Sequence, residues 1–188
     1  MARTETKKAP LQEAALRLFV EKGIAGTTTR EIAESAGIAE GTIYRHYPSK
    51  DALAWDLFSR NFMRLAVEID RLQSQETTLR EKIHRMVSMF FSLYDMDQTL
   101  FRYILLSQHN LLYRVTPEMP NPTSVVVNVI KEAMLKGEIP QRDPQLAAGM
   151  VMGIVMQTAI THIYERINGK LVNHTKEVSE ACWRVLEK

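Results

Sequence analysis

Cysteine is nearly absent from this 188-residue chain, and Cys182, the single one, can form no internal disulfide. Glycine and proline number only 8 and 7, which excludes collagen-like and low-complexity proteins. The most apolar segment, residues 146–160, contains Gln157 and Thr158 and is shorter than the ~18 apolar residues that indicate a membrane span. The N-terminal segment lacks the apolar core of a signal peptide. We therefore expect a globular, cytoplasmic protein that neither crosses nor binds a membrane.

Residue patterns typical of catalysis and metal binding are missing as well. The five histidines are scattered without a His-x-x-x-His pair, and the chain has no Cys-x-x-Cys and no glycine-rich phosphate loop. Cys182 lies four residues before Leu186 on an apolar stripe, which is typical of a small core residue rather than a nucleophile. We expect no catalytic residue, no metal and no cofactor. A small all-α enzyme remains an alternative that no motif supports.

Net charge is only +2, too little to indicate a nucleic-acid-binding protein by itself. Its distribution is uneven, because the first 50 residues hold eight Lys or Arg against six Glu, whereas the rest of the chain is balanced. The excess indicates an asymmetry between the two parts of the chain but does not identify a partner.

Helix signals run through the whole chain, and strand signals are almost absent. Apolar residues recur at spacings of three and four, and side chains that cap helices precede most of the periodic segments. These signals predict an all-α fold in which short helices come first and longer helices of a bundle follow. The expected helices span about 8–22, 29–36, 40–47, 50–72, 79–94, 98–108, 122–136, 144–168 and 175–187, and a loop spans 109–121.

Two of the short helices fit the pattern of a helix-turn-helix. Ala33 is small where the two helix backbones approach, Gly37 tolerates a positive φ in the turn, and Ile43 can hold the second helix on the first. The same pattern would also suit a helical hairpin inside an all-α core with no DNA role. Periodicity alone leaves both interpretations open.

The residues around this pattern carry a resemblance to a known family. Gly23–Ala33 (GIAGTTTREIA) and Ala36–Leu53 (AGIAEGTIYRHYPSKDAL) resemble the DNA-binding segment of TetR/AcrR-type transcriptional regulators. The resemblance is specific over about residues 11–53 and only architectural beyond them. It implies a three-helix DNA-binding head in residues 1–48, a helical domain for ligand binding and dimerisation in residues 49–188, and a homodimer on a palindromic double-stranded DNA operator.

Candidate DNA-binding residues cluster in this head. Thr28 precedes a helix N-terminus, where a hydroxyl and free N–H groups can hold a phosphate, and Arg30 and Arg45 can read guanine. The resemblance implies that Gly41 and Thr42 contact bases, and that Tyr44, His46 and Lys50 contact phosphates.

Two charged residues of the head raise separate questions. Lys50 lies in the first turn of a helix, where its charge is unfavourable, so a partner outside the chain is expected. Glu40 would repel a phosphate unless it accepts from a cytosine or stays solvated.

The penultimate long helix predicts contact with a second subunit. Residues 144–168 are apolar on nearly every side, and a helix of that kind is buried all round. In so short a chain, we expect one face on the core and another on a partner. Gly149 and Gly153 would allow close approach of a partner's helix, or would only relieve crowding within the chain. The expected dimer interface consists of Gly149, Gly153, Val178, Cys182 and Val185.

Methionine is abundant, with ten residues, and many lie near aromatics on the expected core helices. Such residues usually form only a core, but they can also line a deformable apolar pocket with a few polar markers. In the second case the effector is a small apolar or aromatic molecule. The resemblance implies that this effector releases a repressor from DNA. The candidate pocket residues are Met86, Phe90, Tyr94, Phe101, His109, Met152, Met156 and Gln157.

The sequence thus favours a ligand-controlled DNA-binding repressor. A helical module for protein interaction and a small enzyme are the alternatives from other classes.

Overall fold

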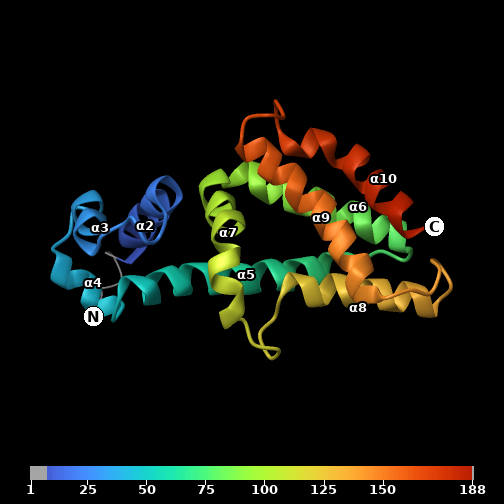
Figure 1. Cartoon of the computed structure of the whole chain (residues 1–188), viewed down its shortest axis with the longest axis horizontal. Coiled ribbons are helices and arrows are strands. Elements are labelled where there is room, and N and C mark those ends of the chain that lie inside the picture. The colour runs from blue at the N-terminus through green and yellow to red at the C-terminus, as the bar shows by residue number, and fades with distance from the viewer. Residues whose placement is uncertain (1–7, 188) are drawn as a thin grey trace. The chain divides into compact units, whose positions relative to one another are not determined.

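The computed structural model describes residues 8–187, and in that part of the chain all regular structure is helical, so the all-α prediction is confirmed (Figure 1). Arg3 and Lys7, which contributed to the basic count, lie outside the described residues. The α-helices are α2 (Lys8–Lys22), α3 (Thr29–Ser35), α4 (Glu40–His46), α5 (Lys50–Gln73), α6 (Leu79–Met96), α7 (Gln98–Leu111), α8 (Pro122–Leu135), α9 (Pro144–Ile163) and α10 (Thr175–Leu186). Two short 3-10 helices span Leu112–Arg114 and Leu171–His174.

The chain divides into two compact units. One consists of Met1–Asn61 and Thr99–Val115, and the other of Phe62–Gln98 and Thr116–Lys188. Helix α5 contributes residues to both. The functional division between residues 48 and 49 stays a prediction, because compactness does not report function.

In the first unit, α3 and α4 form the predicted helix-turn-helix. Ile32, Ala33 and Ile43 are buried between the helices, and Gly37 takes φ +63° in the turn. The N–H of Ile38 donates to the carbonyl of Ala33 at 3.0 Å, which closes the C-terminus of α3. A small residue, a positive-φ glycine and an apolar anchor therefore occupy the positions that the crossing requires.

Helix α2 and helix α7 complete the core of this unit. The rings of Phe19 on α2 and Tyr103 on α7 are stacked with centroids 5.9 Å apart. The buried Tyr103 hydroxyl donates to the carbonyl of Ala54 on α5 at 2.7 Å. Arg114 lies over the ring of Trp55 at 4.4 Å, which attaches the segment after α7 to α5.

In the second unit, α10 packs against α6 and α9, and α9 packs against α8 (Figure 1). Capping side chains precede these helices, as expected: Thr78 forms a capping box with Glu81, and Asn121 and Asp143 accept from the N–H groups of the second or third helix residue. Proline follows each of these last two caps, where its missing N–H costs nothing.

Two predicted helix ends are wrong. Helix α9 ends at Ile163 rather than 168, because Glu165 takes φ +58° and the N–H of Arg166 donates to the carbonyl of Thr161. Gly169, with φ +80°, therefore lies in the following loop and does not end the helix. Helix α7 continues to Leu111, so His109 is helical and the loop starts later than expected.

By length and composition alone, α9 could cross a membrane, with a mean hydropathy of 1.5 over its most apolar window. Only 22% of that window is buried in the chain, and the other residues are partly or fully exposed. One helix of this kind is weak evidence for a membrane span, since helices of soluble proteins meet the same criteria.

Candidate nucleic-acid interface and effector region

Helix α4 buries one face and exposes the other. Ile43 is completely buried against α3, whereas Gly41 and Arg45 are exposed and 53% of Tyr44 is accessible. No atom of the described residues would lie within 4 Å of a Cβ placed on Gly41, so the backbone is open at that point. Thr42 is half-buried at the edge of this face. The arrangement leaves a short helix face free to enter a groove of a duplex.

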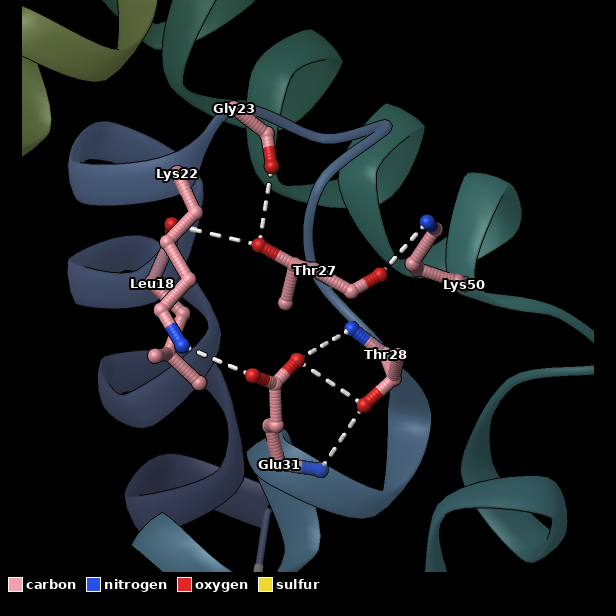
Figure 2. Close-up of polar contacts among 7 residues, drawn as sticks. All are labelled: Leu18, Lys22, Gly23, Thr27, Thr28, Glu31 and Lys50. Atoms are coloured by element: carbon pink, nitrogen blue, oxygen red, sulfur yellow. Dashed lines mark hydrogen bonds and ion pairs between the residues drawn. The ribbon is translucent and has the colours of Figure 1, made fainter.

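The loop before α3 is held by hydrogen bonds to its neighbours (Figure 2). The buried Thr27 hydroxyl contacts the carbonyls of Gly23 at 2.8 Å and Leu18 at 3.2 Å. Thr28 caps α3: its Oγ1 accepts from the N–H of Glu31, and the Glu31 carboxylate accepts from the N–H of Thr28 at 2.8 Å. Residue 28 is therefore fixed at the start of α3 before any phosphate binds.

Lys22 on α2 donates to Glu31 at 2.7 Å, and this bond links α2 to the capping box. The hydrogen bond from Lys22, followed by those from Thr28, lowers the pKa of the Glu31 carboxyl to about 2. The carboxylate therefore stays ionised at neutral pH. The positive charge of Lys22 is already paired in the described chain.

Lys50 has partners inside the chain. Its Nζ donates to the backbone carbonyl of Thr27 at 2.6 Å (Figure 2). The same Nζ lies 3.4 Å from the carbonyl oxygen of Ala25. Carbonyl oxygens of the loop before α3 therefore partner this charge within the chain, and the expected partner outside the chain stays a prediction. An ammonium group has three donor hydrogens, so Lys50 can donate to a phosphate and to these carbonyls at the same time. The phosphate contact itself stays a prediction.

Other polar residues of the head are also engaged. Arg30 forms an ion pair with Glu34 at 2.9 Å on the exposed side of α3. Glu40 accepts from the Thr29 hydroxyl at 2.6 Å and is exposed to solvent, and its relation to DNA stays a prediction. The buried Nε2 of His46 has no hydrogen-bond partner among the described residues.

The sequence reasoning missed a hydrogen-bonded cluster at the C-terminus of α4. Tyr47 donates to Asp56 on α5 at 2.9 Å, and Gln12 on α2 donates to the Tyr47 hydroxyl at 2.8 Å. In the sequence, Gln12 lies 35 residues from Tyr47 and Asp56 lies 9 residues from it. The local sequence signal for this cluster is the spacing of four between Asp56 and Arg60, which is typical of an ion pair along a helix. The two side chains do form an ion pair, at 3.6 Å.

The predicted pocket residues are divided between the two compact units. Phe101 and His109 belong to the first unit, and the other members belong to the second. Met86 and Phe101 are buried, whereas His109 and Gln157 are exposed. The remaining members, Phe90, Met152 and Met156, are half-buried.

The second unit has a depression of about 480 Å³ between α6 and α10, and none of the predicted residues lines it. Its lining is polar and includes Arg80, His84, Ser179 and Glu180. The apolar pocket therefore stays a prediction, and core packing accounts for the buried members of the set.

Tyr94, another predicted pocket residue, is fully buried and already has a polar partner. Its hydroxyl lies 2.9 Å from Nδ1 of His162, and Nε2 of His162 lies 2.7 Å from the carbonyl oxygen of Gly169. Because a carbonyl only accepts, Nε2 carries a proton, and in neutral imidazole Nδ1 then accepts from Tyr94. Asp95 accepts from the N–H groups of Leu171 and Val172, at 3.0 Å each. These bonds fix both ends of the loop between α9 and α10.

Part of the predicted dimer surface is exposed on α9. No atom of the described residues lies within 4 Å of a Cβ placed on Gly149 or Gly153, so crowding within the chain does not explain these glycines. Leu146 and Met150 on the same helix are 59% and 38% exposed. Helix α9 is therefore not buried all round in one chain, and its outer face is apolar and uncovered.

Two members of the predicted interface set are buried within a single chain, and their contact with a partner stays a prediction. Cys182 is completely buried and its Sγ lies 3.8 Å from the carbonyl of Val151, while Val178 is also buried. Both side chains face the core of their own unit, because α10 packs on α6 and α9. Burial raises the pKa of the Cys182 thiol to about 12, as expected for a core residue. Val185 is half-buried and remains available to a partner.

Metal-ligating side chains do not gather within residues 8–187: no group of three or more His, Cys, Asp or Glu side chains could hold an ion there.

Comparison with known proteins identifies similar regulators. The family described as bacterial regulatory proteins, tetR family, matches residues 11–56. The fatty acid metabolism regulator protein of Bacillus subtilis is 25% identical over 185 residues, which cover 96% of this chain and 95% of that protein. The HTH-type transcriptional repressor KstR2 of Rhodococcus jostii is 39% identical over 57 residues, or 30% of this chain and 28% of the repressor.

Among solved structures, the fold is similar to the transcriptional regulator FadR from Bacillus subtilis in complex with stearoyl-CoA. The TM-score is 0.76 at 23% identity, with 94% of this chain and 97% of that chain covered. These relatives are regulators, and none of them supports the enzyme alternative.

Proposed function

This chain belongs to the TetR family of bacterial regulatory proteins and is a transcriptional regulator, and we propose that it is a cytoplasmic repressor whose homodimer binds a palindromic operator. The observation that carries the proposal is the helix-turn-helix within the matched residues 11–56, in which α4 leaves one face uncovered. Repression is supported by the similarity of the head to a known repressor. The DNA-binding head consists of residues 1–48, and residues 49–188 serve dimerisation and ligand binding.

In this proposal, α4 enters the major groove. Gly41 and Thr42 contact base edges, and Arg45 reads guanine from the exposed side of α4. Arg30 on α3 contacts DNA as well, and its ion pair with Glu34 must break for this contact to form. Phosphates are held by Thr28, Tyr44, His46 and Lys50. Because phosphate contacts dominate, we expect binding that weakens steeply with salt.

The uncovered face of α9 supports the homodimer. Gly149 and Gly153 leave room for a second helix, and Leu146 and Met150 supply apolar area. Val185 on α10 extends this surface. A twofold dimer presents two copies of α4 to a palindrome, with half-sites one helical turn, ~34–36 Å, or more apart.

The effector, in this proposal, is a small molecule with an apolar portion that binds in the second unit and releases DNA. Its chemistry is supported by the relatives, one a fatty acid metabolism regulator and one a regulator in complex with stearoyl-CoA. The methionine- and phenylalanine-rich helices of the unit suit an acyl chain. The charged part of such a molecule would stay at the surface, because burying an unpaired charge is costly.

Selection of duplexes from a random DNA library by the unaltered protein tests this function directly. We expect a palindromic sequence to emerge, and fluorescence anisotropy should then show salt-dependent binding that stearoyl-CoA weakens. Failure to enrich any duplex would refute DNA binding and favour a protein-interaction module. Enrichment with no response to stearoyl-CoA would retain the regulator and refute this effector.

A further inference from the structure

The cluster formed by Gln12, Tyr47 and Asp56 joins three helices of the first unit. Tyr47 is the C-terminal cap residue of the recognition helix α4, Gln12 lies on α2, and Asp56 lies on α5. The Tyr47 side chain is buried, so its bonds to Gln12 and Asp56 are largely protected from competing water. The recognition helix is thus tied to α5 by a side-chain bond in addition to the chain itself.

A second anchor fixes the start of α5. Lys50 donates to the carbonyls of the loop before α3, six residues before Asp56. Six residues of α-helix span about 9 Å. One contact alone would leave α5 free to swing about it, whereas two contacts this far apart define the direction of the helix relative to the head.

We propose that the bond from Tyr47 to Asp56 is a positioning device that sets the angle between the recognition helix and α5, and thereby the operator half-site spacing that the dimer accepts. The inference rests on the proposed function, because it requires a dimer that binds two half-sites. Neither residue needs to touch DNA.

The chemistry of the hydrogen bond from Tyr47 to Asp56 favours a bond that persists at physiological pH. Burial, and then the hydrogen bond to Asp56, raises the pKa of Tyr47 to about 12, so the phenol remains a donor at every physiological pH. A hydrogen bond to a carboxylate is stronger than one between neutral groups. Gln12 on α2 donates to the phenol oxygen of Tyr47, and this second bond fixes the position of the ring.

Tyr47→Phe removes only the hydroxyl, and Asp56→Ala removes the acceptor. Tyr103→Phe is the matched control, because it deletes another buried hydroxyl of the first unit that also bonds to α5 but does not involve α4. Each protein is tested by anisotropy on the duplex selected by the unaltered chain, and on duplexes with one base pair added or removed between the half-sites. One base pair shifts a half-site by ~3.4 Å.

We expect the unaltered protein and Tyr103→Phe to discriminate strongly against the altered spacings. Tyr47→Phe and Asp56→Ala should reduce this discrimination by at least about fivefold, the lower end of usual coupling between sites. Asp56→Asn keeps an acceptor and should retain part of the discrimination between spacings. A general loss of stability would instead lower the affinity for all three duplexes alike, and circular dichroism checks that each variant is folded.

Full discrimination in folded Tyr47→Phe and Asp56→Ala would overturn the inference while leaving the regulator intact. A selected operator without any spacing preference in the unaltered protein would also overturn it. If no duplex is selected at all, the proposed function fails, and this inference fails with it.

Discussion

Gly153→Glu separates folding of the chain from dimerisation. A Cβ at position 153 meets no neighbouring atom within 4 Å outside its own stretch of helix, and Gly153 is exposed, so we expect the substitution to leave the fold of one chain undisturbed. Glycine inside a helix costs about 1 kcal/mol relative to a good helix former, so α9 itself should gain stability. In the proposed dimer, however, the new carboxylate would be buried against a partner's apolar helix.

The expected magnitude follows from the cost of an unpaired buried charge. An effective penalty of ~3–5 kcal/mol per interface raises the dimer dissociation constant roughly 150- to 5,000-fold. Sedimentation equilibrium over a range of concentrations measures this constant. Asn128→Glu, which adds the same charge at an exposed position of α8, is the control and should remain dimeric. An unchanged dimer in Gly153→Glu, or an unaltered chain that is monomeric at micromolar concentration, would refute the assignment of α9.

Three further outcomes are expected. Tyr94→Phe removes the hydrogen bond from a fully buried tyrosine to His162 and should lower the free energy of unfolding by ~0.5–1.5 kcal/mol in urea titrations; no loss would contradict the assigned bond. Thr42→Ala and Arg45→Ala should each relax the preference at one base step, by ~1–3 kcal/mol for a bidentate contact, in competition assays with altered operators; uniform weakening across sequences would contradict base readout. Because the pKa of Glu31 is lowered from 4.5 to about 2, its stabilisation is present above pH 4.5 and lost as the pH falls toward 2. Glu31→Gln should flatten the acid side of the stability profile, and an unchanged profile would rule out this contribution.

Helix starts were predictable because their signals are local. Thr28 and Thr78 cap their helices with the glutamate three residues ahead, and both partners are visible in a window of four residues. The helix-turn-helix was predictable for the same reason, since its turn glycine and apolar anchors lie within about twenty residues.

Features that depend on distant residues were missed. The partners of Lys50 are backbone carbonyls more than twenty residues away, and backbone carries no sequence signal. The inward orientation of Cys182 follows from α10 lying between α6 and α9, which periodicity does not specify. Helix α9 ends where Glu165 takes a positive φ, a conformation that glutamate rarely adopts. Because nothing in the residue type indicates this turn, the apolar pattern predicted a helix that was too long.

The hydrogen bonds that His162 and Asp95 make to the loop after α9 make that loop a site where the chain can be lengthened. His162 holds the carbonyl of Gly169, and Asp95 holds the N–H groups of Leu171 and Val172, so the start of α10 is fixed from α6 and α9 rather than by the residues before it. The residues at 164–166 are exposed. Extra length in a loop with fixed ends costs little, about 0.6 kcal/mol for each doubling. A peptide tag or a dye-binding sequence inserted there would report on α9 without shifting α10 from its place in the core.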